Sequence, residues 1–339
     1  MHPTTVSILG ERALIQRITS RLSLPPWVVV GPGDDAAVIE PERGALEVLT
    51  TDAQVEGIHF DQRFVPPDAI GHRALAVNLS DLAAMGATPR AALLSLVLPD
   101  TLEVATIDGV LDGLLGLAAR HRVALVGGNI TRSPGPFIID VTVTGAAKPR
   151  RVLTRAGARP GDELYVTGTI GDAVVGLRSL RAGHEPHGVA GADLEVRLCE
   201  QRYLRPEPRL RAGTLLGRHR AASACVDLSD GLADGIRQIA EASGVGAVVD
   251  GASVPISEEA SRWHAREGQD AVEASLVGGD DYELLFTVRP SHRGRLRAVQ
   301  KEIGSLPITK IGVVTKERRL IVRGRDGDRD LPPGFEHFR

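Results

Sequence analysis

The sequence predicts an α/β protein that is divided into two domains. Stretches with the two-residue periodicity of strands alternate with stretches of helical periodicity, and Gly-rich turns lie between them. The chain has 339 residues, whereas a single hydrophobic core stops growing at roughly 250–300 residues. A basic segment with Gly and Pro, Lys148–Pro160, interrupts the pattern. We therefore expect one domain at residues 1–150 and a second at residues 151–339.

In the first domain the patterns predict short strands that alternate with two helices. The expected strands are Val28–Val30, Leu46–Thr51, Ala91–Leu98, Val123–Val126 and Ile138–Thr144. The expected helices are His72–Met85, which Gly86 ends, and Ile107–Arg122, whose apolar residues recur at helical spacing. In the last strand Ile139, Val141 and Val143 alternate with Asp140, Thr142 and Thr144. This alternation predicts one buried face and one polar face.

The second domain is predicted to repeat this mixture of strands and helices. The expected strands are Glu163–Thr167, Ala247–Val249, Glu283–Val288, Ile308–Val314 and Leu320–Val322. Helices are expected from Asp172 to Leu180 and from Ser229 to Ser243. The segment His184–Asp193 has little periodicity, and we expect a mobile loop there.

The composition argues against a nucleic-acid or membrane partner. The formal net charge is −3 and Arg is spread along the chain, so no basic stripe is present. The longest apolar runs are far shorter than the roughly 20 residues of a membrane helix, and the N-terminus lacks a signal-peptide pattern. The two cysteines, Cys199 and Cys225, form no CxxC pair. We therefore expect a cytoplasmic protein with neither a disulfide framework nor structural zinc.

Several acidic residues stand at the ends of apolar runs, next to Gly or other small residues. They are Asp34, Asp35, Asp52, Asp81, Asp227, Asp230, Asp280 and Asp281. Strand ends in α/β folds converge on one edge of a sheet, where ligands bind. Carboxylates gathered there repel one another unless cations lie between them. Because these ligands are hard oxygen donors without a Cys/His cluster, they indicate Mg²⁺ and nucleotide phosphate chemistry.

Some other acids and motifs of the sequence have different explanations. Asp172 and Asp234 are better explained as helix caps or turn formers. The chain has no GxxxxGK[ST] loop, no protein-kinase signature set, no GxSxG and no HExxH. Residues 31–36 match GxGxxA, but strand-like residues follow them, and two acids there would repel a metal-free pyrophosphate. A P-loop kinase and a dinucleotide fold are therefore disfavoured.

The motifs that contain these acids resemble those of the thiamine-monophosphate kinase family, which belongs to the aminoimidazole ribonucleotide synthetase-like superfamily. They follow one another in family order over essentially the whole chain. They are Gly33-Asp34-Asp35-Ala36, Thr50-Thr51-Asp52, Gly57-Ile58-His59-Phe60, the segment from Val77 to Ala87, Leu153-Thr154-Arg155-Ala156-Gly157, the segment from Val226 to Leu232, Gly278-Gly279-Asp280-Asp281-Tyr282-Glu283-Leu284 and the closing Gly334-Phe335-Glu336-His337-Phe338. Each motif is weak alone, whereas the ordered set is specific.

The resemblance implies a fold and a reaction. The first half is expected to be an α/β domain whose strands form a barrel with those of a second subunit, giving a homodimer. The second half is expected to be an α+β domain, with ATP and several Mg²⁺ ions between the halves. The implied reaction is Mg²⁺-dependent transfer of the ATP γ-phosphate to thiamine monophosphate, which gives thiamine diphosphate.

The resemblance also implies roles for individual residues. Mg²⁺ ligands are expected at Asp35, Thr50, Thr51, Asp52, Asp81, Asn129, Asp227 and Asp230. ATP contacts are expected at Gly128, Asn129, Arg155 and Ser229, and thiamine phosphate contacts at His59, Asp280 and Phe335. No catalytic base is assigned, since the acceptor phosphate is already ionised. Without the resemblance, His59 would be read as a polar loop residue and Phe335 as an anchor of the chain end.

One departure from the family pattern leaves alternatives open. The family usually has Gly-Gly-Asp where this chain has Gly127-Gly128-Asn129, and the Asn carbonyl coordinates Mg²⁺ without adding charge. A second departure is Asp280 where Glu is common. The alternatives are a sibling ATP-dependent synthetase of the superfamily and a non-catalytic nucleotide-binding paralogue. Nucleotide binding without phosphate transfer would favour the paralogue.

Overall fold

The computed structural model describes residues 4–183, 194–324 and 327–334. These residues form two compact units. The first contains residues 1–79 and 88–148, and the second contains residues 80–87 and 149–339. The predicted loop at 184–193 and Phe335 lie outside the described residues. Among the helices of the described part, none is long and apolar enough to cross a membrane.

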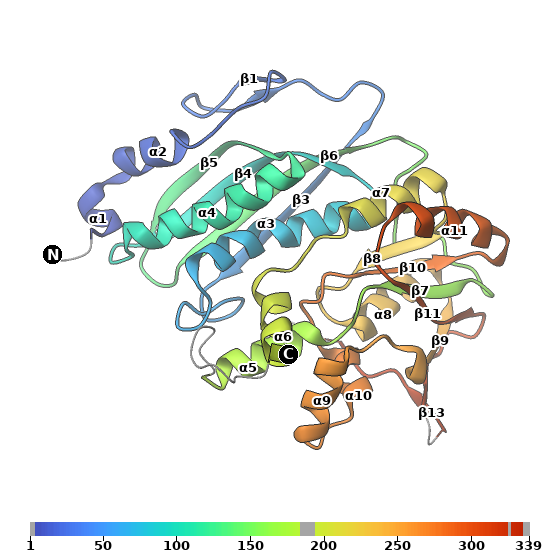
Figure 1. Cartoon of the computed structure of the whole chain (residues 1–339). Helices are drawn as coiled ribbons and strands as arrows, with labels where there is room; N and C mark the ends of the chain where they lie inside the picture. The colour runs from blue at the N-terminus through green and yellow to red at the C-terminus, as the bar shows by residue number, and fades with distance from the viewer. Residues whose placement is uncertain (1–3, 184–193, 325–326, 335–339) are drawn as a thin grey trace. The chain divides into compact units, whose positions relative to one another are not determined.

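The first unit is a four-stranded sheet with helices on one face. Its elements are α1 (Val6–Leu9), α2 (Glu11–Thr19), β1 (Val28–Val30), β2 (Val38–Ile39), β3 (Leu46–Val55), α3 (Pro67–Ala84), β4 (Thr88–Pro99), α4 (Val104–His121), β5 (Ala124–Ser133) and β6 (Ile138–Ala147). The sheet order is β3-β6-β4-β5, with β4 and β5 parallel and the other pairs antiparallel. Figure 1 shows α3 and α4 side by side across one face of this sheet.

The helix-covered face carries the core of the first unit. Ile139, Val141 and Val143 of β6 are fully buried there, as the alternation of this strand predicts. The helices α3 and α4 touch through their backbones, since a Cβ added to Gly71 would lie 1.7 Å from the carbonyl oxygen of Val110. The opposite face, which we call the open face, carries Leu49 of β3 and Leu93 of β4, whose side chains are 66% and 43% exposed.

The second unit is built around a seven-stranded sheet of order β13-β12-β9-β11-β7-β10-β8. Its strands are β7 (Glu163–Thr167), β8 (Ala224–Asp227), β9 (Gly246–Asp250), β10 (Leu284–Val288), β11 (Ile308–Thr315), β12 (Leu320–Gly324) and β13 (Gly327–Asp330). Its helices are α5 (Asp172–Arg181), α6 (Leu194–Leu204), α7 (Leu210–His219), α8 (Leu232–Ser243), α9 (Glu258–Arg266), α10 (Ala271–Val277) and α11 (Arg293–Glu302), with short 3₁₀ turns at Gly251–Ser253 and Pro290–His292.

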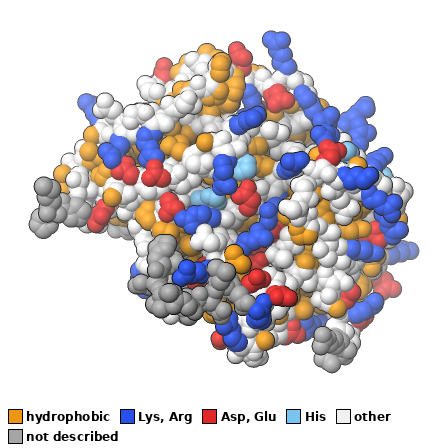
Figure 2. Space-filling view, in the orientation of Figure 1, with side chains coloured by type: hydrophobic (Ala, Val, Ile, Leu, Met, Phe, Trp, Pro, Cys, Tyr) orange, Lys and Arg blue, Asp and Glu red, His pale blue; other side chains and the backbone are white. Residues whose placement is uncertain are grey.

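The core of the second unit lies between the sheet and α8. Leu232, Ile236 and Ile239 of α8 pack into one cluster with Leu164 of β7 and Leu285 of β10. The helix begins at Leu232 rather than at Ser229, because Gly231 just before it has φ +93°. Over the face visible in Figure 2, Lys and Arg side chains are scattered among Asp and Glu.

The predicted mixture of strands and helices is confirmed, but some boundaries were wrong. β3 continues to Val55 and β5 continues to Ser133. Asp52 and Asn129 therefore lie inside strands and not at strand ends. Both strands continue because their partners β6 and β4 extend the ladder past these residues. Asp81 lies within α3, inside the predicted helix His72–Met85, in a turn that belongs to the second unit.

Candidate active site

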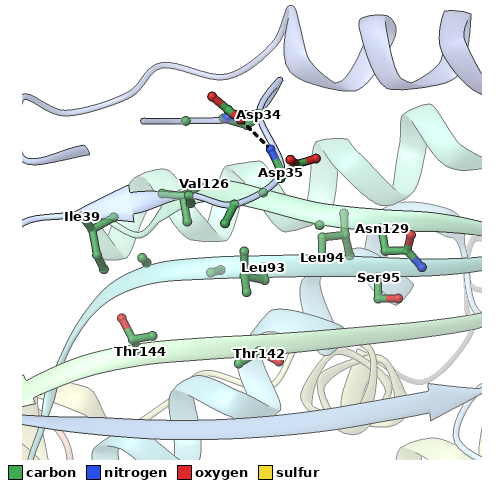
Figure 3. Close-up of a pocket in the computed structure, with 18 of the residues that line it drawn as sticks. Asp34, Asp35, Ile39, Leu93, Leu94, Ser95, Val126, Asn129, Thr142 and Thr144 are labelled. Carbon is green, nitrogen blue, oxygen red and sulfur yellow. Dashed lines mark hydrogen bonds between the residues drawn. The ribbon is translucent and has the colours of Figure 1, made fainter. Parts of the chain in front are cut away.

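The first unit has a cavity of about 530 Å³ on its open face. The loop between β1 and β2 forms one wall with Asp34 and Asp35, and the strands β4, β5 and β6 form the other. Figure 3 shows Leu93 and Ser95 coming from β4 and Asn129 from the neighbouring strand. The backbone N–H of Asp35 donates to Oδ1 of Asp34 over 2.9 Å, so this carboxylate orders its own turn. The Asp35 side chain is exposed.

A polar row crosses the sheet beneath this cavity. Ser95 of β4 is in register with Asn129 on one side and with Asp140 on the other. Residues in register on neighbouring strands share a face, and both Asn129 and Asp140 line the cavity. The Thr51 hydroxyl donates to Oδ1 of Asp140 over 3.2 Å. Asp140 was predicted to be on the polar face but was not assigned to the site.

The three residues Thr50, Thr51 and Asp52 do not share one face of β3. Thr51 is in register with Thr142 on the open face, and their hydroxyl oxygens are 3.0 Å apart. Thr50 and Asp52 are in register with Val143 and Val141, which are fully buried under the helices. Because side chains alternate along a strand, the side chain of Thr51 points away from those of its two neighbours.

His59 lies in the turn that follows β3. Its Nδ1 accepts a hydrogen bond from the backbone N–H of Val55 over 3.1 Å. The backbone N–H of His59 donates to the Val55 carbonyl oxygen over 2.9 Å. An accepting Nδ1 is unprotonated, so a neutral ring here carries its proton on Nε2. The imidazole is half-buried, and the hydrogen bond to Nδ1 fixes its orientation.

The second unit brings Asp81 and Asp227 together. Asp227 ends β8 and is 7% exposed, and its Oδ2 accepts a hydrogen bond from the hydroxyl of Ser80 over 2.7 Å. Burial, together with the charge of Asp81, raises the pKa of Asp227 to about 7. The charge of Arg155 and the Ser80 hydrogen bond oppose this rise. Two acids that repel each other in a buried position form a site that a cation stabilises.

The loop after β8 carries Ser229 and Asp230. The Ser229 hydroxyl donates to Oδ2 of Asp230 over 2.6 Å. The carbonyl oxygen of Ser229 accepts the backbone N–H of Asp280 over 2.7 Å, which places the Asp280 turn against this loop. Arg155 is exposed, and its charge acts on both Asp227 and Asp234.

The donors present are of the type that Mg²⁺ prefers. Within residues 4–183, 194–324 and 327–334, no group of three or more His, Cys, Asp or Glu side chains is arranged to hold a metal ion. Mg²⁺ is commonly held by one or two carboxylates, with water and substrate phosphates completing its shell. Buried Asp227 and half-buried Asp81 fit such an arrangement. The predicted ligands are thus divided between the units, with Asp35, Thr50, Thr51, Asp52 and Asn129 in the first and Asp81, Asp227 and Asp230 in the second.

The predicted site omitted residues that the fold places beside it. Ser80 precedes the predicted ligand Asp81 and contacts a residue 147 positions away. Glu283 is fully buried and forms a two-point ion pair with Arg209. An acid directly before the apolar run Leu284–Val288 was the available signal for Glu283. Its partner could not be read from spacing, since 74 residues separate the two.

Comparison with known proteins first defines the class. The N-terminal domain of AIR synthase related proteins matches residues 33–147, and the C-terminal domain of the same family matches residues 159–325. The chain therefore belongs to the AIR synthase related family, and relatives of 31–40% identity over nearly its full length place it among the thiamine-monophosphate kinases. The expected resemblance is confirmed.

Three relatives show how far the similarity extends. Thiamine-monophosphate kinase of Escherichia coli K12 is 40% identical, covering 97% of this chain and 98% of the relative. That of Bacillus subtilis 168 is 34% identical, covering 98% and 100%. The crystal structure of thiamine-monophosphate kinase from Stenotrophomonas maltophilia K279a has a TM-score of 0.82 at 38% identity, covering 95% of this chain and 98% of that one.

One solved relative holds ligands. The structure described as AaThiL complexed with AMPPCP and TMP has a TM-score of 0.77 at 32% identity and covers 100% of both chains. The hydrogenase maturation protein HypE of Escherichia coli shares the fold alone, with a TM-score of 0.76 at 20% identity.

Proposed function

We propose that this chain transfers the γ-phosphate of ATP to thiamine monophosphate, giving thiamine diphosphate and ADP. The observation that carries this proposal is the full-length similarity to AaThiL, whose complex contains AMPPCP, an ATP analogue, and TMP. The pair of half-buried Asp81 and buried Asp227 supports it, because phosphoryl transfer takes place where metal-bound phosphates are held.

We propose Mg²⁺ as the metal, held by Asp35, Thr50, Thr51, Asp52, Asp81, Asn129, Asp227 and Asp230. When bound, Mg²⁺ neutralises phosphate charge and orients the phosphates of ATP. The side chains of Thr51 and Asp52 point to opposite faces of β3. One of them would therefore act through its backbone oxygen or through water.

The nucleotide is assigned to Gly128, Asn129, Arg155 and Ser229. A Cβ on Gly128 would lie 1.9 Å from the carbonyl oxygen of Leu94, so no side chain fits at this position. Asn129, in the same strand, offers an amide to the cavity. Arg155 is exposed and supplies positive charge for the phosphates.

The acceptor is assigned to His59, Asp280 and Phe335. His59 presents Nε2, because its Nδ1 is occupied by Val55. The carboxylate of Asp280 complements the positive thiazolium ring of thiamine. Phe335 offers a ring that could stack on that cation. The acceptor phosphate is ionised at neutral pH, so it attacks directly in line and no residue of the chain is needed as a base.

We also propose a homodimer that forms through the open face of the first unit. Leu49 and Leu93 are large apolar side chains exposed on this face. Large apolar side chains that are exposed together on a sheet face are typical of an interaction surface. In this proposal residues 1–150 carry the dimer contact, and residues 151–339 contribute further nucleotide and acceptor contacts. The two free, buried cysteines suit a cytoplasmic location.

An acceptor panel tests the reaction. Purified protein is incubated with ATP, Mg²⁺ and either thiamine monophosphate, thiamine or AMP, and ADP release is followed. The proposal predicts release with thiamine monophosphate alone. If no ADP is released with any of these acceptors while nucleotide still binds, the result would favour the non-catalytic paralogue. Asn129 is the specific observation behind that alternative.

A further inference from the structure

The turn that carries Asp280 has an unfavourable backbone conformation. Asp280 has φ +68° and Tyr282 has φ +50°, a region that residues other than Gly rarely adopt. Each such residue costs on the order of 1–3 kcal/mol and persists only when the surrounding structure holds it. The contacts that hold this turn therefore determine where the Asp280 carboxylate lies.

One set of contacts comes from the loop after β8. The N–H of Asp280 donates to the Ser229 carbonyl oxygen over 2.7 Å, and the N–H of Tyr282 donates to that of Leu228 over 2.9 Å. A Cβ on Gly279 would lie 2.5 Å from the same Ser229 oxygen. The turn is thus hydrogen-bonded to this loop through the backbone N–H groups of Asp280 and Tyr282.

A second set of contacts comes from two carboxylates that point inward. Asp281 accepts the N–H of Gly171 over 2.9 Å and that of Ala173 over 3.3 Å, at the start of α5. Glu283 is fully buried, and its Oε2 accepts the Thr167 hydroxyl over 2.6 Å and Nε of Arg209 over 2.7 Å. A second guanidinium nitrogen of Arg209 donates to the other carboxylate oxygen.

The Glu283–Arg209 pair is buried on both sides. The side chain of Glu283 is 1% exposed and that of Arg209 is 11% exposed. A planar guanidinium matches a carboxylate at two points, and Lys does not reproduce this geometry. Glu283 follows Asp280 by three residues. A shift of the Glu283 carboxylate is therefore transmitted to Asp280 through the strained backbone of the turn. Arg209 lies just before α7 and forms the two-point pair with Glu283, while Arg202 of α6 approaches the same carboxylate at 3.6 Å.

We propose that the Glu283–Arg209 ion pair is a positioning element for the acceptor, which fixes Asp280 in its left-handed turn. This inference rests on the proposed function, in which Asp280 contacts thiamine monophosphate. Neither Glu283 nor Arg209 contacts the acceptor in this account.

The test compares Arg209→Lys with Arg293→Lys. Arg293 forms an ion pair with buried Glu163 in the same sheet, away from the Asp280 turn, and serves as the matched control. We expect Arg209→Lys to raise KM for thiamine monophosphate about tenfold, with kcat and KM for ATP within about twofold. Amide hydrogen exchange over residues 278–283 should become about tenfold faster. Arg293→Lys should change neither KM for thiamine monophosphate nor the rate of amide exchange over residues 278–283.

The possible outcomes separate the inference from the proposed function. Faster exchange with an unchanged KM would overturn the role in recognition, and unchanged exchange would overturn the positioning role itself. If Arg209→Lys does not fold, Glu283→Gln takes its place, since it keeps the shape of the side chain and an acceptor for Thr167. A wild-type chain that does not phosphorylate thiamine monophosphate would reject the proposed function. The exchange comparison would then still decide whether the pair holds the turn.

Discussion

Ser80 donates a hydrogen bond to Oδ2 of Asp227 over 2.7 Å, and this bond joins the last turns of α3 to the end of β8. It is one of the contacts of residues 80–87, which belong to the second unit although the rest of α3 belongs to the first. It also orients the most buried of the predicted metal ligands.

Replacing Asp227 by Asn should stabilise the metal-free protein and abolish its activity. Asp227 is buried and is repelled by Asp81, and a neutral isostere removes this repulsion. We expect the free energy of unfolding in EDTA at pH 8 to rise by about 1–3 kcal/mol. Thermal unfolding and a kinase assay on the same preparation measure both effects. A less stable variant would contradict the described environment of Asp227.

Replacing the carboxylate by a neutral amide should destabilise the protein at Glu163, whereas the same replacement should stabilise it at Asp227. Its carboxylate accepts hydrogen bonds from Arg293 and Lys310, and Arg293 makes the largest contribution to lowering its pKa to about 2. Stability that comes from a lowered acid pKa is fully present above the unfolded value of 4.5 and is lost as the pH falls towards 2.

Glu163→Gln should therefore lower the free energy of unfolding by about 2 kcal/mol at pH 7. The difference from wild type should shrink as the pH falls below about 4. Chemical denaturation at pH 7, 5, 4 and 3 measures it, and activity at pH 7 should stay unchanged. A difference that is independent of pH would show that packing, and not charge, stabilises this position.

Asn129→Asp should lower the Mg²⁺ concentration that gives the half-maximal rate. The substitution adds a charge at a position that lines the cavity with Asp35 and Asp140, and a carboxylate binds Mg²⁺ more strongly than an amide. We expect a decrease of about three- to tenfold in a titration of rate against Mg²⁺. Asn129→Gln, which changes the side chain at the same position without adding a charge, is the control. An unchanged requirement in Asn129→Asp would exclude Asn129 as a metal ligand.

Leu49→Glu should dissociate the proposed homodimer. Leu49 is 66% exposed on the open face, and its register partner Thr144 is polar. A carboxylate there would have to be buried without a partner in a dimer, at a cost of several kcal/mol. Light scattering coupled to size-exclusion chromatography should show wild type as a dimer and Leu49→Glu as a monomer. A wild-type monomer would reject the dimer through this face.

Local patterns in the sequence predicted those parts of the fold that depend on local order. The helical spacing of Val110, Leu111 and Leu114 predicted the buried stripe of α4, and the alternation in β6 predicted which of its residues are buried. Gly127 and Gly128 indicated a turn, yet they lie inside β5. Strand length is determined by the pairing partner, and that partner is distant in sequence.

The sequence motifs named the candidate site residues, but they did not specify how these residues are arranged. The row through Asn129, Ser95 and Asp140 depends on the register of three strands, which spacing along the chain does not specify. Thr51 and Asp52 have opposite orientations because β3 continues past both of them, whereas the predicted strand ended at Thr51. Contacts such as that between Glu283 and Arg209 arise from tertiary packing alone.

The central claim is tested most directly by following thiamine diphosphate when the purified chain is mixed with ATP and thiamine monophosphate, with and without Mg²⁺. The account predicts thiamine diphosphate and ADP in equal amounts when Mg²⁺ is present, and no product in EDTA. Bound ATP without thiamine diphosphate at any Mg²⁺ concentration would contradict it.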